Sequence, residues 1–290
     1  MKILISDAFD GSLPGRLESF GEVTDNKDEV GSANVVLVRS KTKCTPEYMD
    51  AAPNLKLIIR GGVGLDNVDL NYAKTKDITV HNTPAASSIA VAELAVGLML
   101  AASGHIAKGH MGMTQGQWLK KELKRVELFK KTVGFLGAGR IATETAKRVQ
   151  AFGTTLVGFD PHLKSHDIVS LKPFDEVLAT SDFLSVHTPL TDSTRHLLDA
   201  AAIDQMKTGS IVVNTSRAEC VDDVAMKAAL DAGKVACYAT DVWPTDPPPA
   251  DNILVGHKSV LMTPHIGASS KENLLRIGDE IVRIISEFKS

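Results

Sequence analysis

Short runs of β-branched and aromatic residues alternate with helix-length segments along almost the whole chain. Strands of this kind, separated by helices, are typical of βαβ units, whose crossover connections make the strands parallel. The pattern predicts an α/β protein with doubly wound parallel sheets. The predicted strands are Lys2–Ile5, Val35–Val38, Leu57–Ile59, Ile78–Val80, Thr132–Leu136, Thr155–Phe159, Phe183–Val186, Ile211–Val213, Ala236–Ala239 and Val260–Met262.

The composition describes a globular chain of 290 residues, which is more than a single core usually holds, so two domains are expected. Acidic and basic residues are mixed, and the net charge is −3, which argues against nucleic acid or an anionic membrane as the main partner. The three cysteines are widely spaced, and their pattern fits neither a disulfide framework nor a zinc site. We therefore expect a reducing, cytoplasmic location, with no membrane segment, no signal peptide and no metal.

A glycine turn follows the predicted strand Thr132–Leu136 and contains Gly137, Gly139, Arg140 and Ile141. Glycines at the first two positions permit a tight turn and a close approach to a pyrophosphate, and the following helix offers free amides to that anion. Asp160 ends the next strand, where it can accept hydrogen bonds from ribose hydroxyls and repel a 2′-phosphate. The unit predicts NAD as cofactor, although an S-adenosylmethionine enzyme could share it.

Polar side chains also follow three later predicted strands, in Thr215-Ser216-Arg217, in the segment from Asp241 to Asp246, and at His265. The carboxyl ends of parallel strands meet at one edge, so these segments can converge on one crevice. An arginine can grip a carboxylate bidentately and polarise a keto oxygen, and a histidine can donate a proton to that oxygen. The combination predicts a dehydrogenase acting on 2-keto acids.

Collectively, these motifs resemble the D-isomer-specific 2-hydroxyacid dehydrogenase family, and most closely its phosphoglycerate-type members. The resemblance implies two Rossmann-like domains with the active site in the cleft between them. Residues 1–97 plus 267–290 would form a flavodoxin-like substrate domain, and residues 98–266 the NAD domain. The segments that carry the resemblance are Val38–Ser40, Arg60–Asp69, Asn82–Pro84, Val91–Glu93, the glycine turn, His187–Thr191 and the three segments above.

The resemblance also implies roles for individual residues. Arg217 would bind and polarise the substrate, His265 would be the general acid and base, and Asp246 would pair with His265 to fix its tautomer. Asp246 stands where the family has Glu, so we expect its shorter carboxylate to lie farther from His265 or to reach it through water. The remaining residues implied to line the cofactor are Thr188, Thr215, Ser216, Asp241 and Gly267.

Two segments of the N-terminal third are candidates for substrate binding. The turn with Gly62, Val63 and Gly64 could offer amides to a carboxylate, with Val63 in place of a frequent Thr. Arg39 and Ser40 match a pair that phosphoglycerate-type relatives use for the substrate phosphate. This favours oxidation of D-3-phosphoglycerate to 3-phosphohydroxypyruvate, the first step of serine synthesis.

Alternatives to this activity remain open. One is a glyoxylate, hydroxypyruvate or D-lactate-type reductase, and another is an NAD(H)-sensing protein similar to the dehydrogenase-like corepressors. Asp246 and the charged Glu219, where a small or apolar residue is more typical, together favour the second slightly. The Lys-rich segment 105–131 is either a solvated connector or, by resemblance, the arm of a homodimer. We expect the protein to lack the C-terminal serine-sensing extension of longer relatives.

Overall fold

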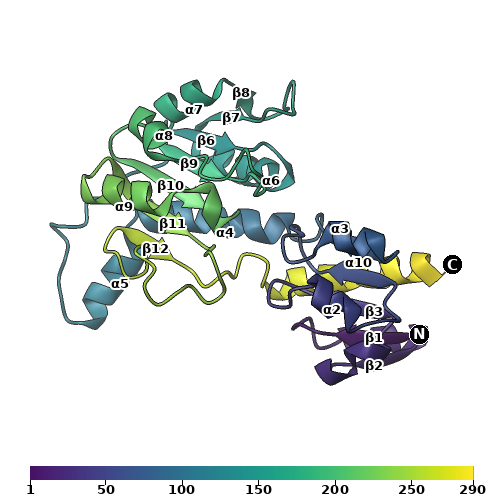
Figure 1. Ribbon diagram of the computed structural model, residues 1–290. Helices are drawn as coiled ribbons and strands as arrows, with labels where there is room; N and C mark the ends of the chain where they lie inside the picture. The colour runs from purple at the N-terminus through teal and green to yellow at the C-terminus, as the bar shows by residue number, and fades with distance from the viewer. Residues whose placement is uncertain (290) are drawn as a thin grey trace. The chain divides into compact units, whose positions relative to one another are not determined.

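The computed structural model describes residues 1–289 and divides the chain into two units, residues 1–90 with 268–290 and residues 91–267 (Figure 1). The sequence places these boundaries at 97/98 and 266/267. The first of those positions lies inside the helix α4 (Ser88–Ser103). Ala95, Leu98 and Met99 of this helix pack into a core of the second unit, and this is why the division falls before the body of the helix.

The first unit contains a five-stranded parallel sheet in the order β2-β1-β3-β4-β5. This is the flavodoxin-like order, as predicted, and its direction of winding changes between β1 and β3. Its strands are β1 (Lys2–Ile5), β2 (Glu22–Thr24), β3 (Val35–Val38), β4 (Leu57–Arg60) and β5 (Thr79–Asn82), and its helices are α1 (Leu13–Leu17), α2 (Pro46–Asp50), α3 (Leu70–Thr75) and α10 (Lys271–Lys289).

Helices cover both faces of this sheet because successive strand residues point to opposite sides. In β1, Ile3 packs with α1 and α10, whereas Leu4 packs with residues of α2 and α3. All four residues of β3 are buried, as expected for a strand covered on both faces. Two short 3₁₀ helices, η1 (Glu18–Phe20) and η2 (Lys27–Ser32), complete the unit.

The second unit contains a seven-stranded parallel sheet in the order β12-β11-β10-β9-β6-β7-β8. Counted from β6, this is the Rossmann order with one further strand. Its strands are β6 (Thr132–Leu136), β7 (Thr155–Phe159), β8 (Ser170–Leu171), β9 (Phe183–Val186), β10 (Ser210–Asn214), β11 (Val235–Thr240) and β12 (Val260–Met262). Besides α4, its helices are α5 (Ile106–Thr114), α6 (Arg140–Val149), α7 (Phe174–Thr180), α8 (Ala200–Gln205) and α9 (Asp223–Asp231), with η3 (Gln150–Phe152) and η4 (Ala218–Cys220).

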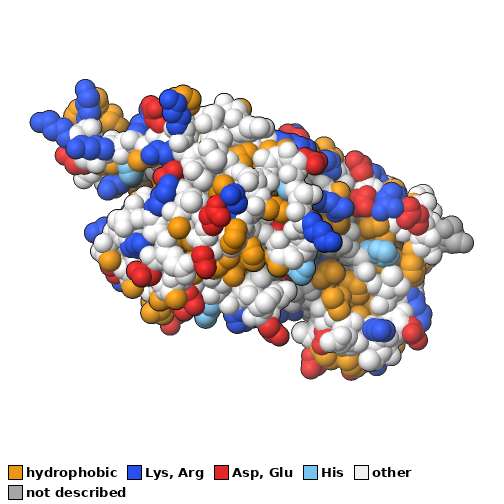
Figure 2. Space-filling view, turned by 90° about the horizontal axis from the view of Figure 1, so that it is seen from above, with side chains coloured by type: hydrophobic (Ala, Val, Ile, Leu, Met, Phe, Trp, Pro, Cys, Tyr) orange, Lys and Arg blue, Asp and Glu red, His pale blue; other side chains and the backbone are white. Residues whose placement is uncertain are grey.

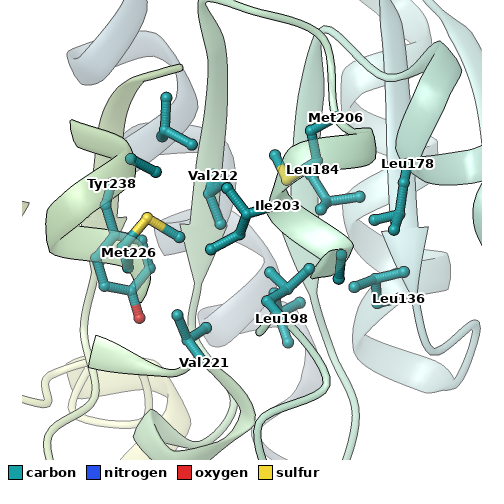
Figure 3. Packing of buried hydrophobic residues seen from close by; sticks show 14 of the residues in the cluster. Leu136, Leu178, Leu184, Leu198, Ile203, Met206, Val212, Val221, Met226 and Tyr238 are labelled. Carbon is teal, nitrogen blue, oxygen red and sulfur yellow. The ribbon is translucent and has the colours of Figure 1, made fainter. Parts of the chain in front are cut away.

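Two cores flank this second sheet. One packs α4 and α6 against residues such as Phe135 and Val213, and the other packs α7, α8 and α9 against Leu184 and Val212 (Figure 3). The doubly wound architecture predicted for both units is therefore confirmed. The prediction missed β2 and β8, which are edge strands of three and two residues and carry little hydrophobic pattern.

The segment 105–131 begins at His105, whose φ of 52° turns the chain between α4 and α5. Figure 1 shows α5 and the loop after it extending away from the sheet of their unit. In the described part of the chain no single helix is long and apolar enough to cross a membrane, and α4 with α5 passes that test only as a pair bent by 61° and only by length and composition.

Candidate active site and cofactor loop

The glycine turn between β6 and α6 combines two glycines with different surroundings. Gly137 has a φ of 84°, and a Cβ there would lie 3.0 Å from the carbonyl carbon and oxygen of His187. Gly139 is the N-cap of α6, and a Cβ there would meet nothing within 4 Å. Gly137 is thus required by the protein's own packing, whereas the side-chain position of Gly139 is open space that a ligand can approach.

The N-terminus of α6 supplies the chemistry of an anion site. The first amides of a helix, here those of Arg140 and Ile141, have no partner inside the helix and carry the positive end of its dipole. Asp160, just past β7, accepts hydrogen bonds from the amides of Ala138 and His162, each at 2.9 Å. The acid predicted to bind the ribose is therefore hydrogen-bonded directly to the glycine turn, and the residues fit a dinucleotide.

A histidine that the sequence analysis did not select holds the loop after Asp160. Nδ1 of His166 accepts the amides of Ile168 and Val169 at 3.1 Å, and its Nε2 lies 2.9 Å from the Thr143 hydroxyl. That hydroxyl donates to the carbonyl of Gly139, so Nε2–H of His166 must donate to it. The network fixes the tautomer of His166 and fastens this loop to the first turn of α6.

The residues after β9 lie directly behind the glycine turn. The ring of His187 is 2.9 Å from the Ser185 hydroxyl and stacks on Phe135 at 5.9 Å between centroids. Desolvation lowers the pKa of His187 from 6.5 to about 4, so the ring is neutral near pH 7. Thr188 is buried, and its hydroxyl donates to the sulfur of Cys220 at 3.5 Å. This contact joins the loop after β9 to the helix η4.

Arg217 follows β10 and has an extended backbone, with φ −139° and ψ 137°. Its Nη1 donates to the carbonyl of Ser216 at 2.7 Å. Thr215 is buried, and its hydroxyl oxygen has no hydrogen-bond partner among residues 1–289. A buried hydroxyl without a partner is costly, and a cofactor in this loop is one source of the missing hydrogen bond. Ala218, the residue after Arg217, does not have a positive φ, so its side chain causes no backbone strain there.

His265 and Asp246 form a direct pair, with 2.6 Å between Nδ1 and Oδ2. The expectation that the shorter aspartate lies farther away or bridges through water is wrong, because the loop from β11 brings its carboxylate to the ring. A carboxylate only accepts hydrogen bonds, so Nδ1 carries the hydrogen and Nε2 is left for proton transfer. His265 has a φ of 54°, a conformation uncommon for residues other than glycine and often found at functional sites.

Asp241 holds the segment that carries His265. Its buried carboxylate accepts hydrogen bonds from the Thr263 hydroxyl at 2.6 Å and from the amides of Ile266 and Gly267 at 2.8 and 2.7 Å. Trp243 donates from Nε1 to the Thr263 carbonyl at 3.0 Å. The loops after β11 and β12 are therefore fastened to each other on both sides of His265. Asp241, which the family resemblance implies to line the cofactor, thus also stabilises the loop that carries His265.

The candidate substrate residues of the first unit lie past β3 and β4. Arg39 donates from Nη1 to the Ala8 carbonyl at 3.3 Å, and from Nη2 to Ala268 and Ser269 at 3.1 and 3.3 Å. Desolvation lowers the pKa of Arg39 from its ordinary value. Ser40 is exposed. The Arg39 guanidinium, which is predicted to bind the substrate phosphate, thus already makes hydrogen bonds to oxygens of its own unit.

The glycine turn after β4 is more closely packed than the turn after β6 and is not followed directly by a helix. Gly61 and Gly62 are buried, and Cβ atoms there would lie 2.5 Å from Phe9 and 1.6 Å from the Arg60 guanidinium. Val63 is 38% exposed, and its carbonyl accepts from Asn82 at 2.5 Å. The next helix, α3, starts only at Leu70, so no helix N-terminus backs the amides around Gly64.

Besides His166, two residues that shape loops with predicted site residues, one in each unit, were not selected from the sequence. Asp7 accepts the amides of Arg39 and Thr42 at 2.7 and 3.1 Å, which shapes the loop after β3. Asn214 shapes the turn that carries Arg217. An Asn two residues before a Ser at a strand end is a signal for such a side-chain turn, and it could have been recognised. Among the described residues no group of three or more His, Cys, Asp or Glu side chains could hold a metal ion.

The fold and this loop define a nucleotide-dependent dehydrogenase, and comparison with known proteins gives the family. Residues 96–267 match the model of the D-isomer specific 2-hydroxyacid dehydrogenase, NAD binding domain. The chain belongs to this family, and it is an NAD-dependent oxidoreductase. The family resemblance noted in the sequence is confirmed.

Several relatives are similar over most of the chain. The hydroxypyruvate reductase of Thermotoga maritima is 44% identical over 89% of this chain and 87% of its own length. The D-3-phosphoglycerate dehydrogenase of Methanocaldococcus jannaschii is 39% identical over 94% of this chain and 54% of its own length. This chain therefore spans about half the length of that dehydrogenase.

Solved structures agree with the fold. The NAD-dependent formate dehydrogenase of Staphylococcus aureus, in complex with NAD, has a TM-score of 0.90 at 30% identity, covering 100% of this chain and 96% of its own. The D-lactate dehydrogenase of Aquifex aeolicus, complexed with NAD and lactic acid, has a TM-score of 0.87 at 27% identity, covering 99% and 95%.

Proposed function

We propose that this protein catalyses the reversible NAD-dependent oxidation of a D-2-hydroxy acid, with Arg217, His265 and Asp246 as its catalytic residues. The observation that carries the proposal is the direct hydrogen bond of 2.6 Å between His265 and Asp246, in the same unit as the NAD loop. A titratable ring with one nitrogen held by a carboxylate and the other left for transfer is the arrangement that general acid and base catalysis needs.

Each side chain has a separate task in this reaction. When bound, NAD would supply the hydride acceptor for oxidation of the hydroxy acid, and NADH the hydride donor for reduction of the keto acid. His265 takes the hydroxyl proton on Nε2 during oxidation, and the Asp246 carboxylate stabilises the imidazolium that forms. In reduction the same proton returns to the keto oxygen. Arg217 binds the substrate carboxylate through its guanidinium fork and polarises the keto oxygen.

For the substrate we propose D-3-phosphoglycerate, oxidised to 3-phosphohydroxypyruvate as the first step of serine synthesis. Arg39 and Ser40 support this choice, because they follow β3, next to the point where the winding of the first sheet reverses. Ligands bind at such points in open α/β sheets. An arginine has five N–H donors, so the hydrogen bonds that Arg39 makes to protein oxygens leave capacity for a phosphate.

Unphosphorylated hydroxypyruvate is the second candidate, with glyoxylate and D-lactate-type substrates behind it. Two of the three Arg39 nitrogens already bond to Ala8, Ala268 and Ser269, which is the task of a structural arginine. The 44% identity with the hydroxypyruvate reductase of Thermotoga maritima points the same way. Both candidates share the three-carbon keto acid and differ only in the phosphate.

The test measures NADH oxidation with 3-phosphohydroxypyruvate, hydroxypyruvate, glyoxylate, pyruvate and 2-ketoglutarate. Replacing Arg217 with Ala should lower kcat/KM about 1000-fold, or about 4 kcal/mol, because it removes a bidentate charge-assisted contact. NADH affinity should be unchanged. The control is Arg283→Ala, which removes only surface ion pairs of α10 to Glu280 and Glu287. An active Arg217→Ala variant would refute the assignment.

The two substrates are separated by Arg39→Ala. If the phosphorylated acid is the substrate, this variant should lose activity with 3-phosphohydroxypyruvate and keep its activity with hydroxypyruvate. If Arg39→Ala lowers activity equally with both acids and the wild-type protein prefers hydroxypyruvate, the proposed reaction stands but the proposed phosphate site is wrong.

We further propose that the protein is a cytoplasmic homodimer. The segment 105–131 exposes large apolar side chains, among them Met111, Met113 and Trp118, which is 74% exposed. Figure 2 shows lysines and arginines beside hydrophobic side chains where this segment extends. An exposed apolar patch with a polar rim is typical of an interface. The three cysteines are free, which suits a reducing compartment.

A further inference from the structure

Asn214 is the last residue of β10, is fully buried, and uses every hydrogen-bonding position of its side chain. Its Oδ1 accepts from the amide and the hydroxyl of Ser216, both at 3.0 Å. Its Nδ2 donates to the carbonyl of Arg217 at 2.9 Å and to the hydroxyl of Tyr238 at 3.1 Å. Three of these four bonds go to the turn that carries Arg217, so the shape of that turn depends on one side chain.

The fourth bond ties Asn214 to the neighbouring strand β11. Tyr238 is 2% exposed, and its ring packs in the same apolar cluster as Val212, its register partner on β10. Figure 3 shows the ring among these side chains, beside Met226. Burial raises the pKa of Tyr238 to about 12, so the hydroxyl stays neutral. The packed ring therefore presents an acceptor that cannot easily move.

A phenylalanine would fill the same apolar space at position 238, so packing alone does not account for the hydroxyl. Burying a hydroxyl costs free energy that a single hydrogen bond roughly offsets, which leaves little net stabilisation. The bond instead anchors the Asn214 amide to the packed ring of Tyr238, in addition to the three bonds that the amide makes with the turn. With the amide anchored, its oxygen faces Ser216 and its nitrogen faces the carbonyl of Arg217.

We propose that Tyr238 is a positioning residue, which acts through Asn214 to hold Arg217 in the conformation that binds the substrate carboxylate. The connection is continuous: the Tyr238 hydroxyl anchors the amide of Asn214, Asn214 holds Ser216, and the Ser216 carbonyl accepts from Nη1 of Arg217 at 2.7 Å. The inference rests on the proposed function, in which Arg217 binds the keto acid. It adds that the accuracy of this binding is set from the core of the NAD-binding unit.

The experiment compares Tyr238→Phe, Asn214→Ala and the double variant in the full chain. Tyr238→Phe should raise the KM for the preferred keto acid about three- to ten-fold, the effect of one neutral hydrogen bond. The Kd for NADH should stay within about two-fold and Tm should change little, a separation that general destabilisation of the unit would not produce. Asn214→Ala should have the larger effect on KM.

The double variant tests whether the two residues act together. If Tyr238 acts through Asn214, Tyr238→Phe should change KM no further once Asn214 is Ala, whereas independent effects would multiply. Tyr48→Phe is the matched control, since it also removes a buried tyrosine hydroxyl but from the first unit, and it should leave KM unchanged.

The outcomes separate this inference from the proposed function. An unchanged KM in Tyr238→Phe, multiplicative effects in the double variant, or a parallel loss of NADH binding and Tm would each overturn the positioning role, provided that Arg217→Ala is inactive. An active Arg217→Ala variant would instead remove the proposed function on which the inference rests.

Discussion

Two glycine turns follow parallel strands in this protein, one after β6 and one after β4, and they do different work. Gly139 in the first has open space where a side chain would be, and the helix α6 starts at the next residue. In the second turn, a Cβ added to Gly61 or Gly62 would clash with Phe9 or Arg60. The next helix, α3, begins only at Leu70. Open space backed by a helix N-terminus marks a ligand site, whereas close neighbours mark a packing requirement.

The comparison shows that glycine content alone does not identify an anion site. Both turns look alike in sequence, as Gly-x-Gly after an apolar strand. The first also has an acid, Asp160, hydrogen-bonded to its amide at Ala138. The second turn makes hydrogen bonds within its own unit. The carbonyl of Gly62 accepts from the Thr83 amide, and the carbonyl of Val63 accepts from the Asn82 side chain. The predicted carboxylate nest there stays a prediction.

Among the changes that test the difference between the two turns, the largest effect is expected from Gly139→Ala. A methyl group in the open space before α6 should block the approach of the pyrophosphate and remove charge-assisted hydrogen bonds, raising the Kd for NADH about 100-fold, or about 2.7 kcal/mol. Unfolding should be unaffected, because no neighbour within 4 Å is disturbed. Fluorescence titration with NADH measures this. Gly97→Ala in α4, which also meets nothing within 4 Å, is the control. Wild-type NADH affinity in Gly139→Ala would remove the distinction between the turns.

An effect of intermediate size is expected from pH, through His187 behind the first turn. Its pKa is about 4 in the folded protein against 6.5 for a free imidazole, so the unfolded chain binds more protons between these values. Stability is therefore fully present above pH 6.5 and is lost as pH falls toward 4, by about 2 kcal/mol between pH 7 and 5.

Urea unfolding at both pH values checks this expectation. His187→Gln places an amide that does not titrate near Ser185 and should lose less stability between pH 7 and 5 than the wild-type protein. Equal losses in the two proteins would show that burial does not hold this ring neutral.

The smallest effect is expected from Gly62→Ala in the second turn. Its φ of 147° favours glycine, but the nearest obstacle is the flexible end of the Arg60 side chain, so the cost should be about 1 kcal/mol of unfolding free energy. NADH affinity should not change. Thermal unfolding and NADH titration measure the two quantities, with Gly15→Ala, which has no neighbour within 4 Å, as control. Weaker NADH binding would mean that this turn also serves the cofactor.

Much of the architecture was predictable because a strand that is buried on both faces is a continuous run of apolar residues in the sequence. Six predicted strands, including β6 and β7 around the cofactor loop, have the observed bounds. The strands β2 and β8 were not predicted because they bury few residues and therefore lack an apolar pattern in the sequence. The chemistry of NAD binding was likewise visible, because the turn, the helix and the acid are close in sequence.

The sequence by itself determined the fold class, because strand periodicity is a local pattern, and the resemblance of its motifs to a known family pointed to that family and to NAD. Only the tertiary structure decided how side chains far apart in the chain meet. It brought Asp246 within 2.6 Å of His265, placed the Arg39 guanidinium on Ala268, and set the Tyr238 hydroxyl against Asn214. Hydrogen bonds of this kind require positions set to a few tenths of an ångström, and packing of the whole unit fixes those positions, whereas sequence spacing does not.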